Sequence, residues 1–366
     1  MQASPDTDSA RVAPACFSRV SNHGHFPLIP GSDAQRRSGA EPSDLGRYPT
    51  PVDRLLTRGK SELWVKRDDL SHPDYGGNKV RKLEGLLAEL HARGTRRIVT
   101  VGAAGSHHVL ATTYFGRRAG LDVEAVLVPQ PRTEHAAEVL RASIGQGVRA
   151  FPVDRWSAAP WAVARRIATG ARYLPFGGSS VTGAMGYANA ARELVRQVQS
   201  GVLPEPSTCV VALGSGGTAA GLAAGLVATP LRTRVLAVCV SPPAWVLRLA
   251  ARRIARGCAA RLGLEGAQAE LGRRLVFTGA FIGPGYGRAT DVTRLAQEEG
   301  RLFGLELDPT YTAKAFAAAL AELDATPMSA PVVLYWHTLS SAPLAPLLRH
   351  APSESDLSTS LRELLV

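Results

Sequence analysis

The feature that most constrains this chain is a repeated alternation of short apolar runs with amphipathic runs. Each apolar run has the length of a strand and precedes a run with helical spacing: RRIVTVG precedes HHVLATTYFGRRAG, VEAVLV precedes EHAAEVLRASIGQG, and CVVALGSGG precedes TAAGLAAGLVA. Strands that alternate with helices form parallel sheets covered on both faces. We therefore predict an α/β fold, with any ligand at the carboxyl ends of the strands.

The length of the chain and its first residues limit its organisation and location. With 366 residues, 45% of them hydrophobic, the chain can bury a full core and is long enough for two lobes. Residues 1–44 mix Pro, Gly and Ser without a period, so we expect a poorly ordered N-terminal extension. No apolar run approaches the roughly 20 residues that span a bilayer, and the first residues lack a signal-peptide pattern. We expect a cytoplasmic protein without a membrane partner.

Charged residues and cysteines argue against two other classes of protein. The net charge is +11, but the cations are mostly dispersed arginines without an aromatic-interleaved basic stripe, so we expect no nucleic-acid partner. The four cysteines are scattered without a C-x-x-C pair, so we expect neither a disulfide framework nor a metal site. Lysine is rare. Covalent chemistry on a lysine has five candidates, which are Lys60, Lys66, Lys79, Lys82 and Lys314.

The run DYGGNKVRKLE places Lys79 directly after two glycines and Asn78. The leucines that follow, from Leu83 to Leu90, form one apolar helical face, which leaves Lys79 at the entrance of the helix. Glycines fix an unusual backbone and leave room for a large group beside the lysine. A lone lysine is more often a solvated surface residue, so this interpretation depends on the loops near it.

Two further strand-to-helix loops carry residues suited to anions. The loop GAAGSHH presents Ser106, His107 and His108 at a positive helix end, which suits a carboxylate, with an ordinary helix cap as an equal alternative. The loop LGSGGTAAGL opens a helix, so its backbone N–H groups and the Thr218 hydroxyl suit a phosphate better than a simple tight turn. It lacks the lysine of a P-loop, and VCVS ends the next strand without the acidic residue of a dinucleotide site.

These three loops together indicate one cofactor. A phosphate-binding loop, a lysine on a glycine turn and an anion-binding loop are the parts needed for pyridoxal 5'-phosphate joined to a lysine, with an amino-acid substrate beside it. The sequence therefore predicts a pyridoxal-phosphate enzyme with a small amino-acid substrate.

Six segments follow one another in the order and spacing of a known family: RYPTPVDRL, WVKRDDL, GGNKVRKLE, GSGGTAAGL, GPGYG and DPTYTAK. From about Leu45 to the last strand, the chain resembles the 1-aminocyclopropane-1-carboxylate deaminase and D-cysteine desulfhydrase family. This resemblance implies the tryptophan-synthase-β-like fold type II, with two open parallel-sheet domains and the cofactor in the cleft between them. It implies a large cofactor-binding domain over residues 45–81 and 186–366, a small domain over residues 82–185, and a homodimer.

The resemblance also implies roles for individual residues. Lys79 corresponds to the lysine that forms the Schiff base. Ser106 corresponds to the serine beside the substrate carboxylate, and Tyr286 and Tyr311 correspond to the two active-site tyrosines. The other implied cofactor contacts are Asn78, His107, Gly214, Ser215, Gly216, Gly217, Thr218 and Thr338, of which Thr338 faces the pyridine nitrogen.

Three departures from the family pattern bear on the substrate. His107 replaces an asparagine, and because an unperturbed histidine titrates with a pKa of about 6.5, we expect its contact with the cofactor to depend on pH near neutrality. Leu339 and Ser340 replace two glycines and add bulk near the cofactor ring. Thr312 stands where the ring-opening deaminases carry a glutamate.

The residues favour a desulfhydrase-like lyase among the reactions of this family. A neutral partner such as Thr338 suits β-elimination better than transamination, and D-cysteine would give pyruvate, ammonia and sulfide. One alternative is ring-opening deamination of 1-aminocyclopropane-1-carboxylate, which Thr312 disfavours. The other is a catalytically silent protein that still binds the cofactor.

Overall fold

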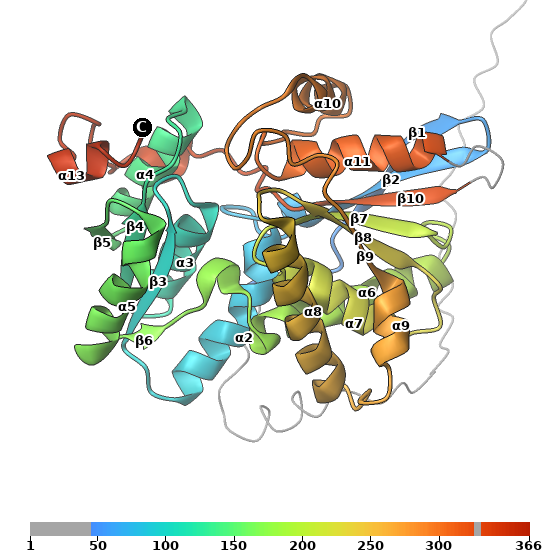
Figure 1. Cartoon of the computed structure of the whole chain (residues 1–366), viewed down its shortest axis with the longest axis horizontal. Helices are drawn as coiled ribbons and strands as arrows, with labels where there is room; N and C mark the ends of the chain where they lie inside the picture. The colour runs from blue at the N-terminus through green and yellow to red at the C-terminus, as the bar shows by residue number, and fades with distance from the viewer. Residues whose placement is uncertain (1–44, 326–330) are drawn as a thin grey trace, which may run out of the picture. The chain divides into compact units, whose positions relative to one another are not determined.

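The computed structural model describes residues 45–325 and 331–366, and Figure 1 shows them as two sheets with helices packed around each. This arrangement confirms the predicted α/β fold with two parallel-sheet domains. The predicted N-terminal extension, residues 1–44, lies outside the described residues. The boundaries predicted for the large and the small domain stay a prediction.

The larger sheet has six strands in the order β1-β2-β10-β7-β8-β9. Strand β1 runs antiparallel to β2, and all other pairs are parallel. Helix α11 packs on one face of this sheet, while α6 and α7 lie on the other (Figure 1). The strands and helices of this part are β1 Val52–Arg58, β2 Ser61–Arg67, α6 Val181–Gln199, β7 Thr208–Leu213, α7 Gly217–Val227, β8 Arg234–Cys239, α8 Ala244–Arg261, α9 Gln268–Arg274, β9 Leu275–Thr278, α10 Asp291–Leu302, α11 Thr312–Ala325 and β10 Val332–His337.

The smaller sheet has four parallel strands in the order β5-β4-β3-β6. Its strands β3 and β4 are buried on both faces, as their continuous apolar runs predict. The C-terminal residues return to this part, where Val366 N donates to Gln130 O at 3.1 Å. Its elements are α2 Asn78–Ala92, β3 Arg97–Ala103, α3 His107–Arg118, β4 Asp122–Val128, α4 Glu134–Gly145, β5 Arg149–Pro152, α5 Ala159–Ala168, β6 Arg172–Tyr173, α12 Ala345–Leu348 and α13 Thr359–Arg362.

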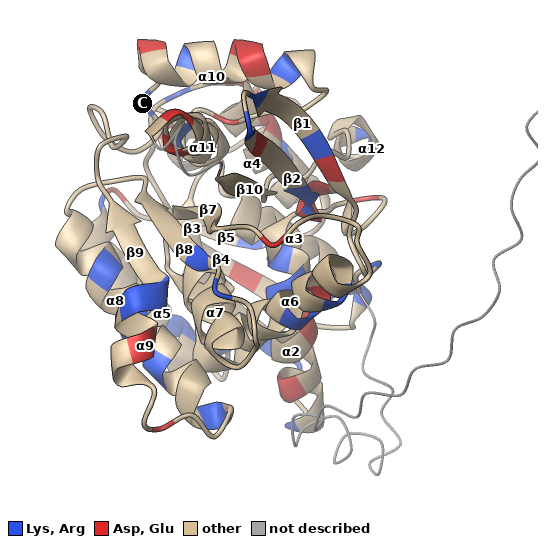
Figure 2. Ribbon diagram, turned by 90° about the vertical axis from the view of Figure 1, so that its right-hand side faces the viewer, with Lys and Arg blue, Asp and Glu red and all other residues tan. Residues whose placement is uncertain are grey.

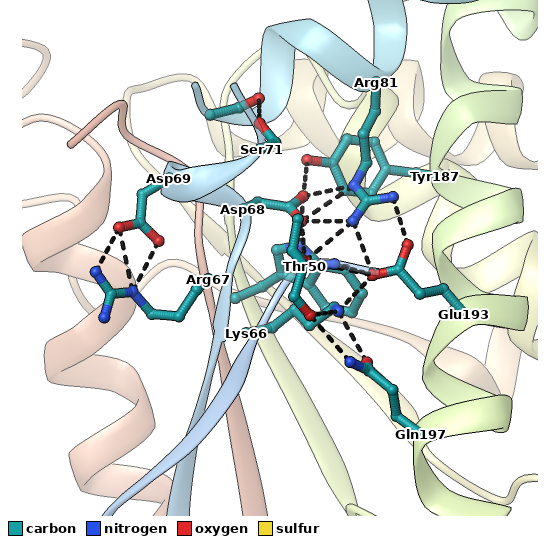
Figure 3. Close-up of polar contacts among 12 residues, drawn as sticks. Thr50, Lys66, Arg67, Asp68, Asp69, Ser71, Arg81, Tyr187, Glu193 and Gln197 are labelled. Carbon is teal, nitrogen blue, oxygen red and sulfur yellow. Dashed lines mark hydrogen bonds and ion pairs between the residues drawn. The ribbon is translucent and has the colours of Figure 1, made fainter. Parts of the chain in front are cut away.

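A buried ion network fastens α2 to the larger sheet and to α6 (Figure 3). Arg81 of α2 donates to Asp68 Oδ1 at 2.7 Å and to Glu193 Oε2 at 2.9 Å. Lys66 of β2 also pairs with Glu193, and its Nζ donates to Gln197 Oε1 at 2.8 Å. All of these side chains are buried. Because α2 begins one residue before Lys79, the network fixes the helix that carries this lysine.

Charges elsewhere are distributed over many elements. Figure 2 shows Lys and Arg on several helices, with Asp and Glu among them. In the described part of the chain, no helix is long and apolar enough to cross a membrane. The three cysteines within that part, Cys209, Cys239 and Cys258, are buried and free.

Candidate active site

A cavity of about 780 Å³ opens at the carboxyl ends of strands from both sheets. Ser106 follows β3, Gly214 follows β7 and Thr338 follows β10, and all three line it. This is the position at which open α/β sheets bind ligands. The other implied site residues that line the cavity are Asn78, Lys79, His107, Ser215, Gly216, Thr218, Tyr286 and Tyr311.

Lys79 lies in the first turn of α2, and its side chain is partly buried in the cavity wall. Its Nζ donates to Asn78 Oδ1 at 2.6 Å. Burial lowers the pKa of the Lys79 amine to about 8, although Asp308 nearby opposes the shift. A lowered pKa makes the uncharged, nucleophilic amine more available near neutral pH.

The glycines before Lys79 are required by close backbone contacts. Gly77 has a φ of +91°, and a Cβ there would lie 2.6 Å from Thr338 O. The same turn is held by the strand-end loop, since Asn78 N donates to Thr338 O at 3.0 Å and Gly76 N donates to Ser340 Oγ at 2.9 Å. The Ser340 side chain therefore fastens the turn that carries Lys79.

The glycine-rich loop after β7 forms a cradle at the start of α7, where a side chain on either glycine would collide with neighbouring residues. Gly216 is left-handed with a φ of +94°, and a Cβ there would lie 3.1 Å from the backbone of Ala251. A Cβ on Gly217 would lie 2.7 Å from Ser179 Oγ. This backbone starts α7, an eleven-residue helix whose first N–H groups point out of its N-terminus. The geometry fits a phosphate group.

Lys82, one of the five lysines of the sequence, is buried at this loop, a contact that no local pattern predicts. It is 2% exposed, and its Nζ donates to Gly177 O at 3.2 Å and to Ser179 Oγ at 3.3 Å. Burial, and then the charge of Lys79, hold the pKa of Lys82 well below its ordinary value. Among the described residues, no carboxylate lies within ion-pair distance of either amine. The buried amine of Lys82 beside the glycine cradle fits a dianionic phosphate.

The two predicted tyrosines meet in the cavity. Tyr311 OH donates to Tyr286 OH at 2.9 Å, and the rings pack edge to face. Burial raises the pKa of both phenols, so both keep their protons. The loop of Tyr286 is held by Lys314, whose buried Nζ donates to Ile282 O at 2.6 Å and to Gly285 O at 3.1 Å.

Asp308 organises the start of α11, and Thr312 belongs to this cap. The Thr312 hydroxyl donates to Asp308 Oδ2 at 2.7 Å, and Tyr311 N donates to Asp308 Oδ1 at 2.7 Å. Thr312 is buried and lines the cavity. Residue 312 therefore brings to the cavity a hydroxyl that is already bonded to Asp308, and its own side chain is not an acid.

The three polar residues of the loop after β3, Ser106, His107 and His108, make different kinds of contact. Ser106 caps α3 by accepting from Val109 N at 3.4 Å, and His108 is buried against Thr100 Oγ1 at 2.9 Å. His107 faces the cavity, where its Nδ1 lies 2.6 Å from Tyr75 OH. Burial, and then the neighbouring His135, lower the pKa of His107 to about 3. The expectation that His107 titrates near neutrality is therefore wrong, because its environment disfavours the charged ring.

Comparison with known proteins identifies the cofactor. A family model described as "Pyridoxal-phosphate dependent enzyme" matches residues 44–338. The chain belongs to the pyridoxal-phosphate-dependent enzymes. The match covers most of the chain and includes the lysine turn and the glycine cradle. Pyridoxal phosphate is thus the group that the two amines and the cradle fit.

Individual relatives place the chain within this family. It is 35% identical over 319 residues to nocardicin C-9' epimerase of Nocardia uniformis subsp. tsuyamanensis, covering 83% of this chain and 93% of that protein. It is 32% identical over 299 residues to D-cysteine desulfhydrase of Yersinia pestis (strain Pestoides F), covering 76% and 86%. A solved structure of an ACC deaminase homologue superposes with a TM-score of 0.71 at 27% identity, covering 85% of this chain and 97% of that chain. The resemblance to the deaminase and desulfhydrase family is confirmed.

Proposed function

We propose that this protein is a pyridoxal-phosphate-dependent lyase that eliminates a β-leaving group from a small amino acid such as D-cysteine, giving pyruvate, ammonia and sulfide. The observation that carries the proposal is the Lys79 amine, which has a pKa of about 8 and lines the same cavity as the glycine loop at the start of α7. Such an amine is partly uncharged near neutral pH and can take a proton from a bound substrate. The site residues named above are proposed for this reaction.

Each part of the cavity has a task in this proposal. The backbone of Gly216 and Gly217, the Thr218 hydroxyl and Lys82 would hold the phosphate. Bound pyridoxal phosphate makes the α-hydrogen of an amino acid acidic, because its ring accepts negative charge. Lys79 would remove that proton, and the start of α3 at Ser106 would orient the substrate carboxylate.

Ring-opening deamination has less support. The position that carries glutamate in those deaminases holds Thr312, whose hydroxyl is bonded to Asp308 at 2.7 Å. Both oxygens of Asp308 accept bonds from the start of α11, so this carboxylate is engaged in capping. Within residues 45–325 and 331–366, the Thr312 position therefore offers no free acid to the cavity.

Epimerisation at the α-carbon is a second candidate. It shares the first proton removal with elimination but returns a proton to the opposite face, so it needs a second donor. The bonded pair of Tyr286 and Tyr311 is such a donor, because both phenols stay protonated in the cavity. The relative at 35% identity, an epimerase by name, supports this candidate.

One experiment separates these functions. The purified holoenzyme is incubated in D2O with D- and L-cysteine, other amino acids with β-leaving groups, and 1-aminocyclopropane-1-carboxylate. Pyruvate with sulfide supports the lyase, 2-oxobutyrate supports ring opening, and deuterium at the α-carbon with inversion supports epimerisation. Turnover of no substrate would reject the enzyme proposals and favour a silent cofactor-binding protein.

A further inference from the structure

An unbroken chain of hydrogen bonds runs from the cavity wall to the protein surface. Tyr75 OH lies 2.6 Å from His107 Nδ1, and His107 Nε2 lies 2.8 Å from Nε2 of His135. The rings of Tyr75 and His107 are stacked. The three residues come from the turn before α2, the start of α3 and the start of α4. All of them line the cavity that holds Lys79.

The chain of hydrogen bonds passes from a buried residue to an exposed one. Tyr75 is 1% exposed, His107 is partly buried, and His135 is exposed to solvent. Among the charged groups that act on His107, Asp308 raises its pKa and Lys79 lowers it. The outer histidine therefore has access to water while the inner phenol does not.

The donor and the acceptor of each hydrogen bond among Tyr75, His107 and His135 can be assigned. Burial raises the pKa of Tyr75 far above its ordinary value, so its hydroxyl is a donor, and His107 Nδ1 accepts from it. His107 must then carry its proton on Nε2 and donate it to His135 Nε2. His135 in turn carries its proton on Nδ1. Each group thus has one proton to give and one lone pair to receive with.

We propose that Tyr75, His107 and His135 form a proton relay that connects the cavity with solvent. A proton reaching the Tyr75 oxygen from the cavity is matched by transfer of the Tyr75 hydroxyl proton to His107 Nδ1. His107 gives its Nε2 proton to His135 Nε2, and His135 releases its Nδ1 proton to water. The net result is one proton moved outward, and the reverse sequence imports one. The use of this relay during turnover rests on the proposed function.

The alternative is that the histidine pair only fastens α3 to α4. His135→Gln separates the two roles, because a glutamine carbonyl can accept from His107 Nε2 but cannot pass a proton on. Histidine-labelled holoenzyme is measured by NMR for the exchange of the His107 Nε2 proton with water. We expect exchange to slow by about tenfold in His135→Gln. Loss of a direct general acid or base costs about 10²–10⁴-fold, and a relay residue that acts through another group should cost less. His91→Gln, at an exposed position in the last turn of α2, is the matched control and should leave the rate unchanged.

This measurement needs no turnover, so it decides the relay independently of the reaction. Absence of a hydrogen-bonded His107 Nε2 proton in the wild type, or equal or faster exchange in His135→Gln, would overturn the relay. An unchanged melting temperature and cofactor absorbance would establish that the variant is folded. If the relay is found but no substrate is turned over, only the proposed function fails.

A second measurement, on variants of Tyr75 and His135, tests the use of the relay in catalysis. With α-deuterated substrate in water, the fraction of deuterium that reaches the methyl group of pyruvate reports how far the abstracted proton exchanges before it is returned. Tyr75→Phe and His135→Gln should each raise this fraction, and the double variant should raise it no further, because the residues act in series. An unchanged fraction in both single variants would reject this use of the relay.

Discussion

Two groups of basic side chains on and around α2 differ in what surrounds them. Lys66 and Arg81 lie in a closed network with Asp68 and Glu193, in which each cation contacts a carboxylate (Figure 3). Lys79 and Lys82 lie on the same helix as Arg81, yet among the described residues neither amine is paired with a carboxylate.

The difference separates a structural role from a binding role. A buried cation is costly unless its charge is compensated, so an amine without a carboxylate has a lowered pKa and can pair with an anion supplied from outside the chain. The closed network fixes the position of α2, and the open pair is proposed to receive the cofactor. Variants in the two groups should therefore change different quantities. Variants of the closed network should change the free energy of unfolding, and variants of the open pair should change cofactor binding or activity.

The largest expected effect is on activity, from Lys79→Ala. Loss of the amine that attaches the cofactor and moves the proton should lower turnover by at least about 10³-fold. Borohydride reduction of the holoenzyme followed by peptide mass spectrometry should place the cofactor on Lys79. The exposed Lys60→Ala is the control and should keep wild-type activity. Cofactor trapped on Lys66, Lys82 or Lys314 would contradict the assignment.

The next effect is on stability, from Arg81→Met. This change leaves Asp68 and Glu193 buried without the cation that both of them contact, and should lower the free energy of unfolding by about 3–5 kcal/mol. Urea denaturation of the apoprotein measures it. Arg196→Met on the exposed side of α6 should change stability by less than about 0.5 kcal/mol. A similar small loss in Arg81→Met would mean that the network does not hold α2.

Much of the fold follows from local pattern. The apolar runs at β3 and β7 and the helical runs after them were sufficient to predict parallel sheets and to place the cavity at the strand ends. Lys79 could be selected because its glycine turn is a local feature of the sequence. Antiparallel β1 was not predicted, since no feature of its sequence shows which way the neighbouring strand runs.

The rest of the site depends on contacts between distant residues. Glu193 lies 127 residues from Lys66 along the chain, and His135 lies 28 residues from His107. Nothing in the sequence near one member of either pair identifies the other. The sequence names Lys82 as one of five lysines but does not indicate a phosphate-binding role for it, because that role depends on burial beside Ser179. His107 was expected to titrate near neutrality because its burial was not known.

A pH dependence of stability should come from His337, which lies beside the closed network at the end of β10. It is fully buried, its Nε2 has no hydrogen-bond partner among the described residues, and Asp69 Oδ2 lies 4.0 Å away. Burial lowers the pKa of His337 to about 4, despite the opposing charge of Asp69. The unfolded chain, with a histidine pKa of about 6.5, therefore binds more protons between pH 6.5 and 4, and stability falls as the pH falls through that range.

The size of this effect is about 2 kcal/mol between pH 7 and pH 5. Unfolding free energies of the wild type and His337→Gln, measured by urea denaturation at both pH values, isolate it from the other titrating groups. The variant should lose about 2 kcal/mol less than the wild type over this interval. Equal losses in the two proteins would show that His337 is accessible to protons in the folded state.

The smallest effect on stability should come from Lys82→Met, the neighbour of Arg81 on α2. Its amine is buried with two neutral acceptors, Gly177 O and Ser179 Oγ, so an apolar side chain of similar length removes a desolvation cost and two hydrogen bonds together. The unfolding free energy of the apoprotein should change by less than about 1 kcal/mol. The affinity for pyridoxal phosphate should fall by about tenfold or more, since a charge-assisted bond to the phosphate is lost. Fluorescence titration of the apoprotein measures affinity. A stability loss as large as that of Arg81→Met, with unchanged affinity, would assign Lys82 to the structural group and remove the distinction between the two.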